Sequence, residues 1–262
     1  MPVSAVKAFQ NFSKYYDLLY QDKDYPKECD FLEEIFRKYA GDMPEAILDA
    51  GCGTGGHSLI LSERGYKVTG IDQSKEMINI AKKKASHIGA RVDFRIMNMI
   101  DFEMGQRFDA CTSMFASVGY VTVNEELHRC FSSIRKHLET NSLFIFDYWN
   151  GPAVLTIKPS VKVKIVKSED ERLIRIATPQ LDAAHHLCKV SYHCIVTKGR
   201  KLVKEFMEEH SMRFLFPEEI RHYLEETSFD LLGIFPFMSL EGEADETVWN
   251  VIAIAKAREE KR

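Results

Sequence analysis

The sequence has no long hydrophobic run, no paired cysteines and no excess of basic residues, and each absence narrows the possibilities. No stretch approaches the roughly 18 apolar residues of a membrane span, and the first residues lack the apolar run of a signal sequence. Six cysteines are scattered over 262 residues without a C-x-x-C pair, which favours reduced thiols over a disulfide framework. We therefore expect a soluble cytoplasmic protein with no membrane partner.

The chain also has no excess of basic over acidic residues. The chain has 35 Lys and Arg against 39 Asp and Glu, a formal net charge of -4, whereas a nucleic-acid binder needs a concentrated basic stripe. The densest basic cluster, Lys82 to Lys84, falls late in a predicted helix, where positive charge complements the helix dipole. We expect no nucleic-acid partner.

Over the first 150 residues, short apolar strands alternate with segments of helical period. The strands are expected at 46–50, 66–71, 91–97, 108–114 and 142–148, and the clearest helices at 28–40 and 124–138. Strand–helix alternation at this spacing predicts a parallel sheet with helices on both faces. Right-handed crossovers restrict it to the doubly wound class.

The pattern changes after Asn150. Residues 161–216 carry β-rich runs with polar hairpin breaks, which predicts three or four antiparallel strands inserted into the α/β domain. Residues 230–237 and 247–256 supply two closing strands, an antiparallel pair. The expected fold is α/β: a Rossmann-like, doubly wound seven-stranded sheet with an antiparallel last strand, plus a small inserted antiparallel β-sheet.

A glycine-rich loop follows the first buried strand. Gly51, Gly53 and Gly56 fit the dinucleotide pattern G-x-G-x-x-G literally. Glycines let the chain turn sharply and bring its backbone against a ligand, and the next helix offers free N–H groups to an anion. Alone, this motif is consistent with a nucleotide-like ligand or with a tight structural turn.

The residues around the loop narrow the choice. Asp49 stands two residues before Gly51, and the segment 48–55 resembles the first motif of class I S-adenosylmethionine-dependent methyltransferases. Asp72 ends the second strand about 20 residues on, where a carboxylate binds ribose hydroxyls, and residues 72–77 resemble the family's D-x-S-x-x-M segment. The resemblance implies S-adenosylmethionine as cofactor and S-adenosylhomocysteine as its product.

The resemblance also implies a set of cofactor contacts. Asn98 lies where the family usually has an Asp that accepts the adenine amino group, and its side-chain oxygen can accept the same bond. His57 either approaches the methionyl carboxylate or is a solvated surface residue. The full set is Tyr16, Tyr25, Asp49, Gly51, Cys52, Gly53, Gly55, His57, Asp72, Gln73, Met77, Asn98, Met99 and Met114.

The N-terminal aromatics and the segment 114–120 look like the N-methyltransferases that dimethylate nucleotide-linked amino sugars, with glycine N-methyltransferase a more distant relative. In that group N-terminal tyrosines fold over the cofactor, so Tyr16 and Tyr25 are expected to form a lid. The alternative is that both are ordinary aromatics of a surface helix. The group tends to carry a His where this chain has Tyr120, so the resemblance does not carry its amino-sugar specificity to this chain.

The predicted function is transfer of a methyl group from S-adenosylmethionine to a small-molecule acceptor, with an amine favoured, by in-line displacement. Tyr120 and Trp149 are the predicted catalytic, substrate-side residues, with core packing as the alternative for each. Tyr120 could orient a nucleophile or stack against a cation. No metal is expected, because no acid or Cys has ligand spacing around His185, His186 and His193.

Two other functions stay open. One is a non-catalytic S-adenosylmethionine-binding protein. The other is an NAD(P)-dependent oxidoreductase, against which the acid before the glycine loop and the closing pair of strands both argue.

The resemblance and the change of pattern after Asn150 together divide the chain into two parts. Residues 1–150 and 215–262 are expected to form the S-adenosylmethionine-binding methyltransferase domain, with 1–27 as its N-terminal lid. Residues 151–214 are expected to form the inserted antiparallel β subdomain, which would either wall the substrate pocket or form a homodimer interface.

Overall fold

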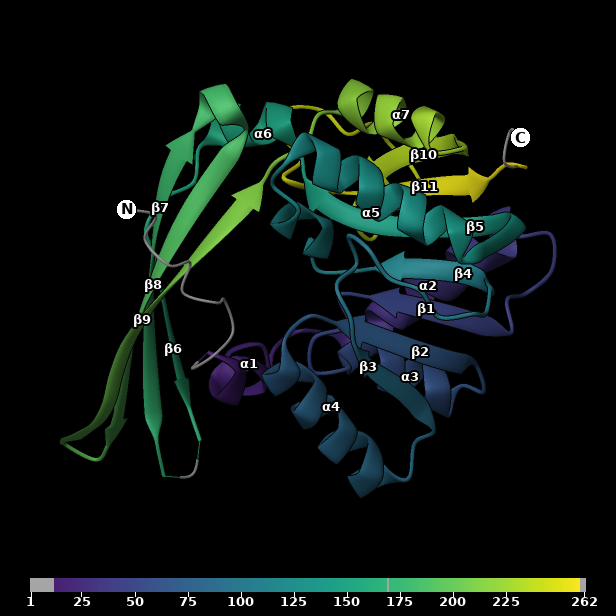
Figure 1. Ribbon diagram of the computed structural model, residues 1–262. Helices are drawn as coiled ribbons and strands as arrows, with labels where there is room; N and C mark the ends of the chain where they lie inside the picture. The colour runs from purple at the N-terminus through teal and green to yellow at the C-terminus, as the bar shows by residue number, and fades with distance from the viewer. Residues whose placement is uncertain (1–11, 169, 260–262) are drawn as a thin grey trace.

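The computed structural model describes residues 12–168 and 170–259, and its largest element is a seven-stranded sheet (Figure 1). Its strands, in spatial order, are β10 (Phe229–Pro236), β11 (Asn250–Ala257), β5 (Leu138–Trp149), β4 (Phe108–Ser113), β1 (Ala46–Ala50), β2 (Lys67–Asp72) and β3 (Val92–Ile96). The strands from β5 to β3 are parallel, and β11 runs antiparallel to both β5 and β10. The predicted fold class is confirmed.

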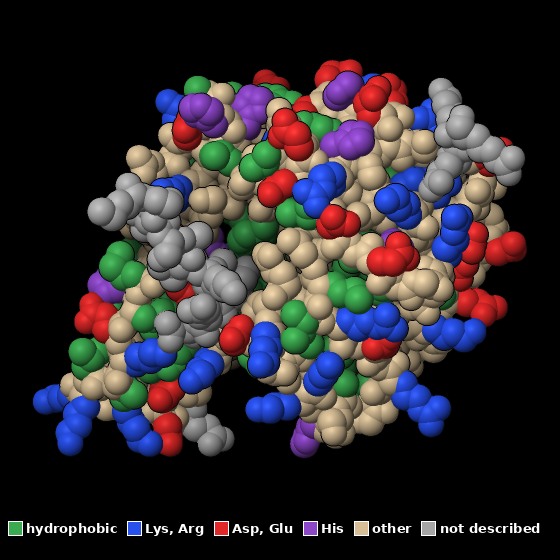
Figure 2. All heavy atoms as spheres, in the orientation of Figure 1, with side chains coloured by type: hydrophobic (Ala, Val, Ile, Leu, Met, Phe, Trp, Pro, Cys, Tyr) green, Lys and Arg blue, Asp and Glu red, His purple; other side chains and the backbone are tan. Residues whose placement is uncertain are grey.

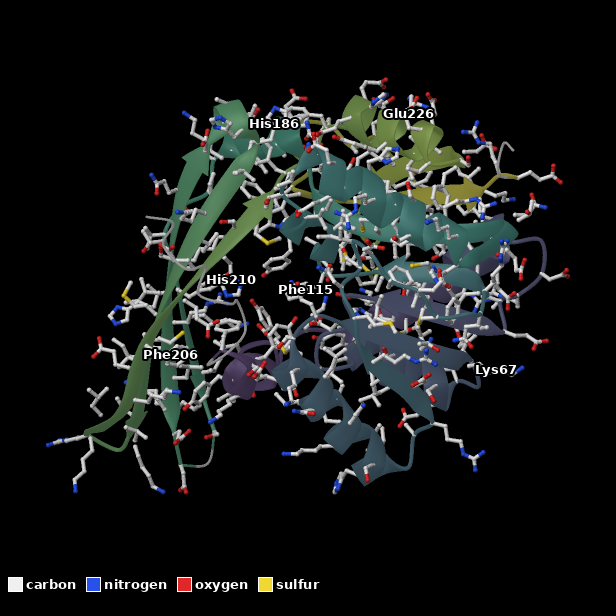
Figure 3. The ribbon with its side chains drawn as sticks, in the orientation of Figure 1. Lys67, Phe115, His186, Phe206, His210 and Glu226 are labelled. Atoms are coloured by element: carbon white, nitrogen blue, oxygen red, sulfur yellow. The ribbon has the colours of Figure 1, made fainter. Side chains whose placement is uncertain are left out.

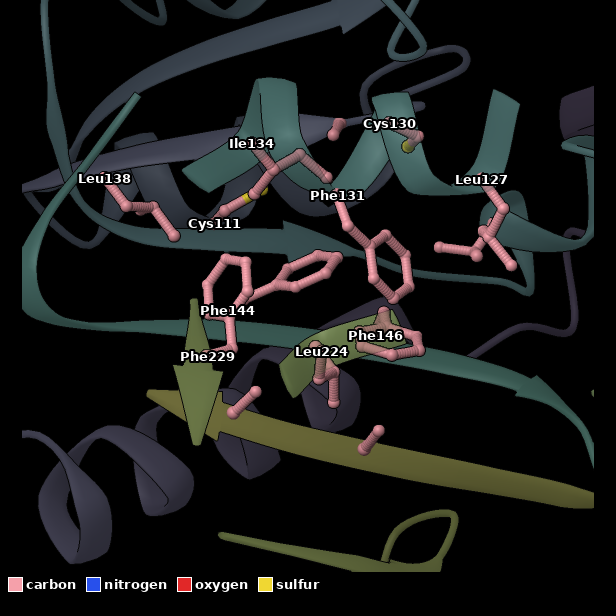
Figure 4. Close-up of a cluster of buried hydrophobic side chains, with 14 of the residues drawn as sticks. Cys111, Leu127, Cys130, Phe131, Ile134, Leu138, Phe144, Phe146, Leu224 and Phe229 are labelled. Carbon is pink, nitrogen blue, oxygen red and sulfur yellow. The ribbon is translucent and has the colours of Figure 1, made fainter. Parts of the chain in front are cut away.

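Helices cover both faces of this sheet. On one face α5 (Asn124–Lys136) and α7 (Pro217–Glu226) contribute to the largest core cluster. On the other face α2 (Tyr25–Tyr39) and α3 (Gly56–Glu63) pack on the same strands. Figure 4 shows the first cluster, in which the Phe131 ring lies 5.2 Å from Phe144 and 5.3 Å from Phe146. These apolar clusters on both faces of the sheet hold its strands, and therefore their carboxyl ends, in place.

Local signals explain where most helices begin. α4 (Lys75–Ile88) starts after Ser74, whose hydroxyl accepts the Met77 N–H at 3.2 Å, as predicted. α2 begins at Tyr25 rather than at residue 28, because the Asp24 carboxylate caps the Lys27 N–H at 3.0 Å. Residue 138 was predicted to end a helix; it is the first residue of β5.

The second sheet stands beside the first and contains four antiparallel strands (Figure 1). They are β6 (Lys162–Lys167), β7 (Arg172–Asp182), β8 (Leu187–Lys198) and β9 (Lys201–Arg213). The short helix α6 (Gly151–Ile157) precedes them. The chain leaves and re-enters the first sheet at one place, where the Leu215 N–H donates to the Trp149 carbonyl at 3.0 Å and Gly151 donates to Leu215 at 2.8 Å.

The first described helix, α1 (Ser13–Leu19), packs on the second sheet. Phe12 and Leu19 are buried with Leu173, Cys194 and Val196 in one cluster. The Phe12 ring also stacks on Tyr192, with centroids 5.2 Å apart. Residues 1–11 of the predicted lid lie outside the described residues.

Two further observations bear on the expectations from composition. All six cysteines are buried, unpaired thiols. Within residues 12–168 and 170–259, every helix is too short or too polar to cross a membrane.

Candidate active site

A cavity of about 1270 Å³ lies between the carboxyl ends of the first sheet's strands and the second sheet. Part of it is visible as a recess between the two parts of the molecule in Figure 2. The first sheet contributes Gly51 after β1, Asp72 at the end of β2 and Asp147 near the end of β5. Open α/β sheets bind their ligands at this edge, where the strand order reverses.

The glycine loop forms the floor of one end of the cavity. Gly51, Gly53 and Gly55 have positive φ angles of 80°, 54° and 80°, a conformation that favours glycine. A Cβ atom on Gly51 would lie 2.7 Å from the Cβ of Ser117, whereas one on Gly53 would meet no atom within 4 Å. Gly51 is therefore needed for the turn itself, while Gly53 leaves its space free for a ligand.

Asp72 is held rigidly beside this loop. Its two carboxylate oxygens accept the Gly53 N–H at 3.0 Å and the Ser74 N–H at 2.7 Å. Burial raises the pKa of the carboxyl group, although both hydrogen bonds oppose that shift. The side chain still lines the cavity, so its oxygens can accept ligand hydroxyls in addition.

Tyr16 and Tyr25 close the cavity over the glycine loop. Their side chains hydrogen-bond to each other, and both line a small recess that opens beside Gly53. The Tyr25 ring covers Gly56, where an added Cβ would come within 2.5 Å of it. Their place in the wall of this recess argues against the interpretation as ordinary surface-helix aromatics.

His57 is buried rather than solvated, so the surface alternative was wrong. Its Nε2 atom lies 2.7 Å from a carboxylate oxygen of Glu28, which also forms an ion pair with Lys23. Burial opposes ionisation of Glu28, but the contacts with His57 and Lys23 outweigh it and lower its pKa. The His57 ring packs edge-on against Tyr25 and lines the recess.

The remaining predicted cofactor residues divide into two groups. Those that line the cavity or its recess are Cys52, Gln73, Met77, Asn98, Met99 and Met114. Asp49 and Gly55 lie behind the loop instead: Asp49 accepts the Ser58 hydroxyl at 2.5 Å, and a Cβ on Gly55 would strike Phe94 at 2.7 Å. A direct cofactor contact by either residue stays a prediction.

Tyr120 and Trp149 both lie on the opposite side of the cavity, next to the second sheet. The Tyr120 hydroxyl lies 2.9 Å from Nδ1 of His210 on β9. Figure 3 shows His210 facing the same space as Phe115 from the other side. Their position on the cavity wall argues against plain core packing for both residues.

His210 was not identified from the sequence. It is one of nine histidines, in a strand whose alternation is typical of any antiparallel sheet. Only the folding of β9 against η1 (Ser117–Tyr120) brings it to the cavity. With Tyr192 and Met212 it shows the second sheet walling the pocket, one of its two predicted roles, while a homodimer interface stays a prediction.

Asp147 was also missed. It is 3% exposed, lines the cavity, and accepts the Ala116 N–H on one oxygen at 2.9 Å. Its other oxygen has no hydrogen-bond partner among the described residues, and desolvation raises its pKa to about 6. The sequence signal was a single acid in an otherwise apolar strand, Leu143–Trp149.

Phe115 and Ala116, which follow β4, adopt left-handed φ angles of 67° and 54°. Such conformations cost on the order of 1–3 kcal/mol each for residues other than glycine. The bond from Ala116 to Asp147 and the Ser117 hydroxyl's bond to the Met114 carbonyl at 2.8 Å hold this turn. The turn places the Phe115 ring in the cavity wall.

His185, His186 and His193, unlike His210, do not line the cavity. The exposed His185 pairs with Asp182 at 2.8 Å, and the half-buried His193 pairs with Glu205 at 2.6 Å. Across the described part of the chain, no group of three His, Cys, Asp or Glu side chains is placed to hold a metal ion.

Comparison with known proteins agrees with this geometry. A family described as "Methyltransferase domain" matches residues 47–141. A putative methyltransferase of Geobacillus sp. (strain WCH70) is 32% identical over 53% of this chain and 56% of its own length. The dTDP-3-amino-3,4,6-trideoxy-alpha-D-glucopyranose N,N-dimethyltransferase of Streptomyces venezuelae is 28% identical over 74% of this chain and 80% of its own. The match thus spans about half the length of the first relative.

Among solved structures, an S-adenosylmethionine-dependent methyltransferase from Clostridium acetobutylicum superposes with a TM-score of 0.78 and 21% identity. The match covers 96% of this chain and all of the other, so the inserted second sheet is part of the shared fold. The fold, the glycine loop, the acid that ends β2 and the domain match over residues 47–141 together make this chain similar to S-adenosylmethionine-dependent methyltransferases.

Proposed function

We propose that this protein transfers the methyl group of S-adenosylmethionine to a nitrogen atom of a small-molecule amine. The observation that carries the proposal is a single cavity with a nucleotide-type floor at one end and aromatic and polar side chains at the other. Its volume of about 1270 Å³ exceeds the roughly 300–1,000 Å³ of an ordinary ligand pocket. It therefore has room for two ligands end to end.

The residues present fit the cofactor. The space above Gly53 is open, Asp72 stands where ribose hydroxyls would be accepted, and Asn98 and Met99 line the neighbouring wall for an adenine ring. Asn98 accepts the Ile100 N–H at 3.0 Å and keeps a second lone pair on the same oxygen. Tyr16 and Tyr25 would cover the methionyl end.

When bound, S-adenosylmethionine supplies a methyl group that its sulfonium already activates. The protein's part is then positioning and exclusion of water, and good alignment can lower a barrier by about 7–11 kcal/mol. The Tyr120 hydroxyl, which lies 2.9 Å from His210, would orient the attacking atom. A neutral amine needs no strong base to attack, whereas an alcohol would need one.

The relative with the N-methyltransferase name that aligns over most of its length supports nitrogen as the attacked atom. The Streptomyces venezuelae enzyme, which aligns over 80% of its length, is named as an N,N-dimethyltransferase. Its sugar substrate is not transferred to this chain by that likeness.

The experiment that tests the proposal is calorimetric titration of the purified protein with S-adenosylmethionine, S-adenosylhomocysteine and NAD, repeated with Asp72→Ala. We expect micromolar binding of the two sulfur nucleotides, lost in the variant, and no binding of NAD. Methyl transfer from labelled S-adenosylmethionine to a panel of amines and matched alcohols follows. Binding of NAD alone, or transfer to alcohols only, would contradict the proposal.

A further inference from the structure

We infer that the acceptor is an amine without phosphate that binds as its ammonium cation, held between the carboxylate of Asp147 and the rings of Trp149 and Trp249, and that passes its proton to this carboxylate before its nitrogen lone pair attacks the methyl group. The inference rests on the proposed function, and it names the chemical class of the acceptor. It follows from the charge of the cavity, from the bonding of one buried acid and from the placement of both tryptophans.

The described part of the cavity wall carries an excess of negative charge. Six acidic and three basic side chains line it, and none of them is an arginine. The acids are Asp22, Glu28, Asp72, Glu76, Glu126 and Asp147, and the bases are Lys23, Lys75 and Lys162. Of the bases, Lys23 is already paired with Glu28. A diphosphate would add about two more negative charges where repulsion is weakly screened, so the wall disfavours nucleotide-linked acceptors.

Asp147 supplies the specific contact. It is 3% exposed, and one of its oxygens has no hydrogen-bond partner within the described residues. A buried carboxylate is costly unless it is paired. An ammonium group bound in the cavity would supply both the missing hydrogen bond and the opposite charge.

Trp149 and Trp249 form two walls next to this acid. Trp149 is two residues after Asp147 on β5, so both side chains point to the same face of the sheet. The two indole rings lie 5.7 Å apart at 64° to each other, and the Asn150 N–H fixes the Trp249 carbonyl at 2.8 Å. Rings set at an angle around a cavity stabilise an organic cation through cation–π contacts.

These two are the only tryptophans in the chain, and both line the cavity. Intrinsic fluorescence therefore reports directly on occupation of this end, without any methyl transfer. The probe we choose is choline, with 3,3-dimethyl-1-butanol as its uncharged twin of nearly the same shape. Both are titrated into the full chain in the presence of saturating S-adenosylhomocysteine.

We expect saturable quenching by choline with a Kd at least about tenfold lower than that of the uncharged twin. Asp147→Asn should raise the choline Kd about tenfold and leave that of the twin unchanged. Glu125→Gln, which removes an exposed charge on the same molecule, is the matched control and should change neither. Trp249→Leu, read through Trp149, should remove the preference for choline.

Equal affinity for choline and its uncharged twin would overturn the inference, as would an Asp147→Asn variant that binds choline normally. Displacement of choline by thymidine diphosphate would point instead to a nucleotide-linked acceptor. Because no step requires turnover, the two failures are distinguishable: a protein that discriminates choline but fails to methylate amines would contradict the proposed function, while the cation site beside Asp147 would remain.

Discussion

Gly51 and Gly53 of the glycine loop have different structural roles. Gly51 and Gly53 both have positive φ angles, but only Gly51 is enclosed by other side chains, namely Ser117 and Met99. The same substitution at the two positions should therefore separate the requirement for folding from the requirement for ligand space.

We predict that Gly53→Ala keeps the fold but loses cofactor binding. Its φ of 54° costs a non-glycine residue roughly 1–2 kcal/mol, so the Tm should fall by only a few degrees. The added methyl group would occupy the open space, and calorimetry should show S-adenosylhomocysteine affinity lowered at least about tenfold. Gly51→Ala should unfold at a much lower temperature, because its Cβ meets two side chains. Normal binding by Gly53→Ala would show that the cofactor does not approach this loop.

The raised pKa of Asp147 predicts that the stability of the folded protein depends on pH. Burial raises its pKa to about 6 in the folded protein, against roughly 3.9 in the unfolded chain. Below about pH 4 the acid is protonated in both states and does not affect the free energy of unfolding. As the pH rises towards 6, the unfolded chain releases the proton that the folded protein still holds, so the free energy of unfolding falls. Asp147→Asn should therefore be more stable than the parent by about 3 kcal/mol at pH 7.5, with most of the difference gone at pH 4.

Urea unfolding at several pH values measures this difference. Exposed Asp42→Asn serves as the control and should show no pH-dependent gain. A parent and an Asp147→Asn variant of equal stability at every pH would mean that the acid is solvated in the folded protein.

At the scale of elements, α1 connects parts that the sequence leaves far apart. One side of it packs on the second sheet through Leu19, together with the preceding Phe12. On another side, Asp17 accepts the Thr54 hydroxyl of the glycine loop at 2.6 Å and pairs with Lys84 of α4 at 3.1 Å. The helix has only seven residues, too few to be stable alone, so these contacts hold it in place.

We predict that Asp17→Ala loosens α1 and weakens cofactor retention. Hydrogen exchange over residues 13–19 should become faster, and the dissociation rate of S-adenosylhomocysteine should rise several-fold. Exposed Lys83→Ala, next to the ion-paired Lys84, should change neither. Protection of α1 that is unchanged in Asp17→Ala would show that packing on the second sheet suffices to hold the helix.

Element boundaries were predictable where a side chain marks them. Ser74 and Pro217 start their helices as the sequence suggests, because capping and ring constraints act locally. The start of β5 was predicted wrongly: residue 138 was assigned to the preceding helix, but it begins the strand. Leu138 fits the apolar period of that helix and the alternation of the strand equally well.

At the scale of the molecule, the doubly wound class followed from the sequence because crossover handedness leaves few topologies. The cofactor end of the cavity was predictable for the same reason: Gly51 and Asp72 end neighbouring parallel strands. The acceptor end was not. His210 comes from a strand 90 residues away from its partner Tyr120, and no periodic pattern encodes how the second sheet lies against the first.

The junction between the two sheets has a consequence for how this architecture can vary. Main-chain hydrogen bonds of 3.0 and 2.8 Å join Leu215 to Trp149 and to Gly151, so the stretch from 151 to 214 begins and finishes at one point in space. Evolution could therefore exchange, shorten or enlarge that stretch as a unit, because its two attachment points stay adjacent whatever is inserted between them. On this view cofactor binding can be inherited with the parallel strands, while the choice of acceptor can be inherited separately, with the inserted stretch 151–214.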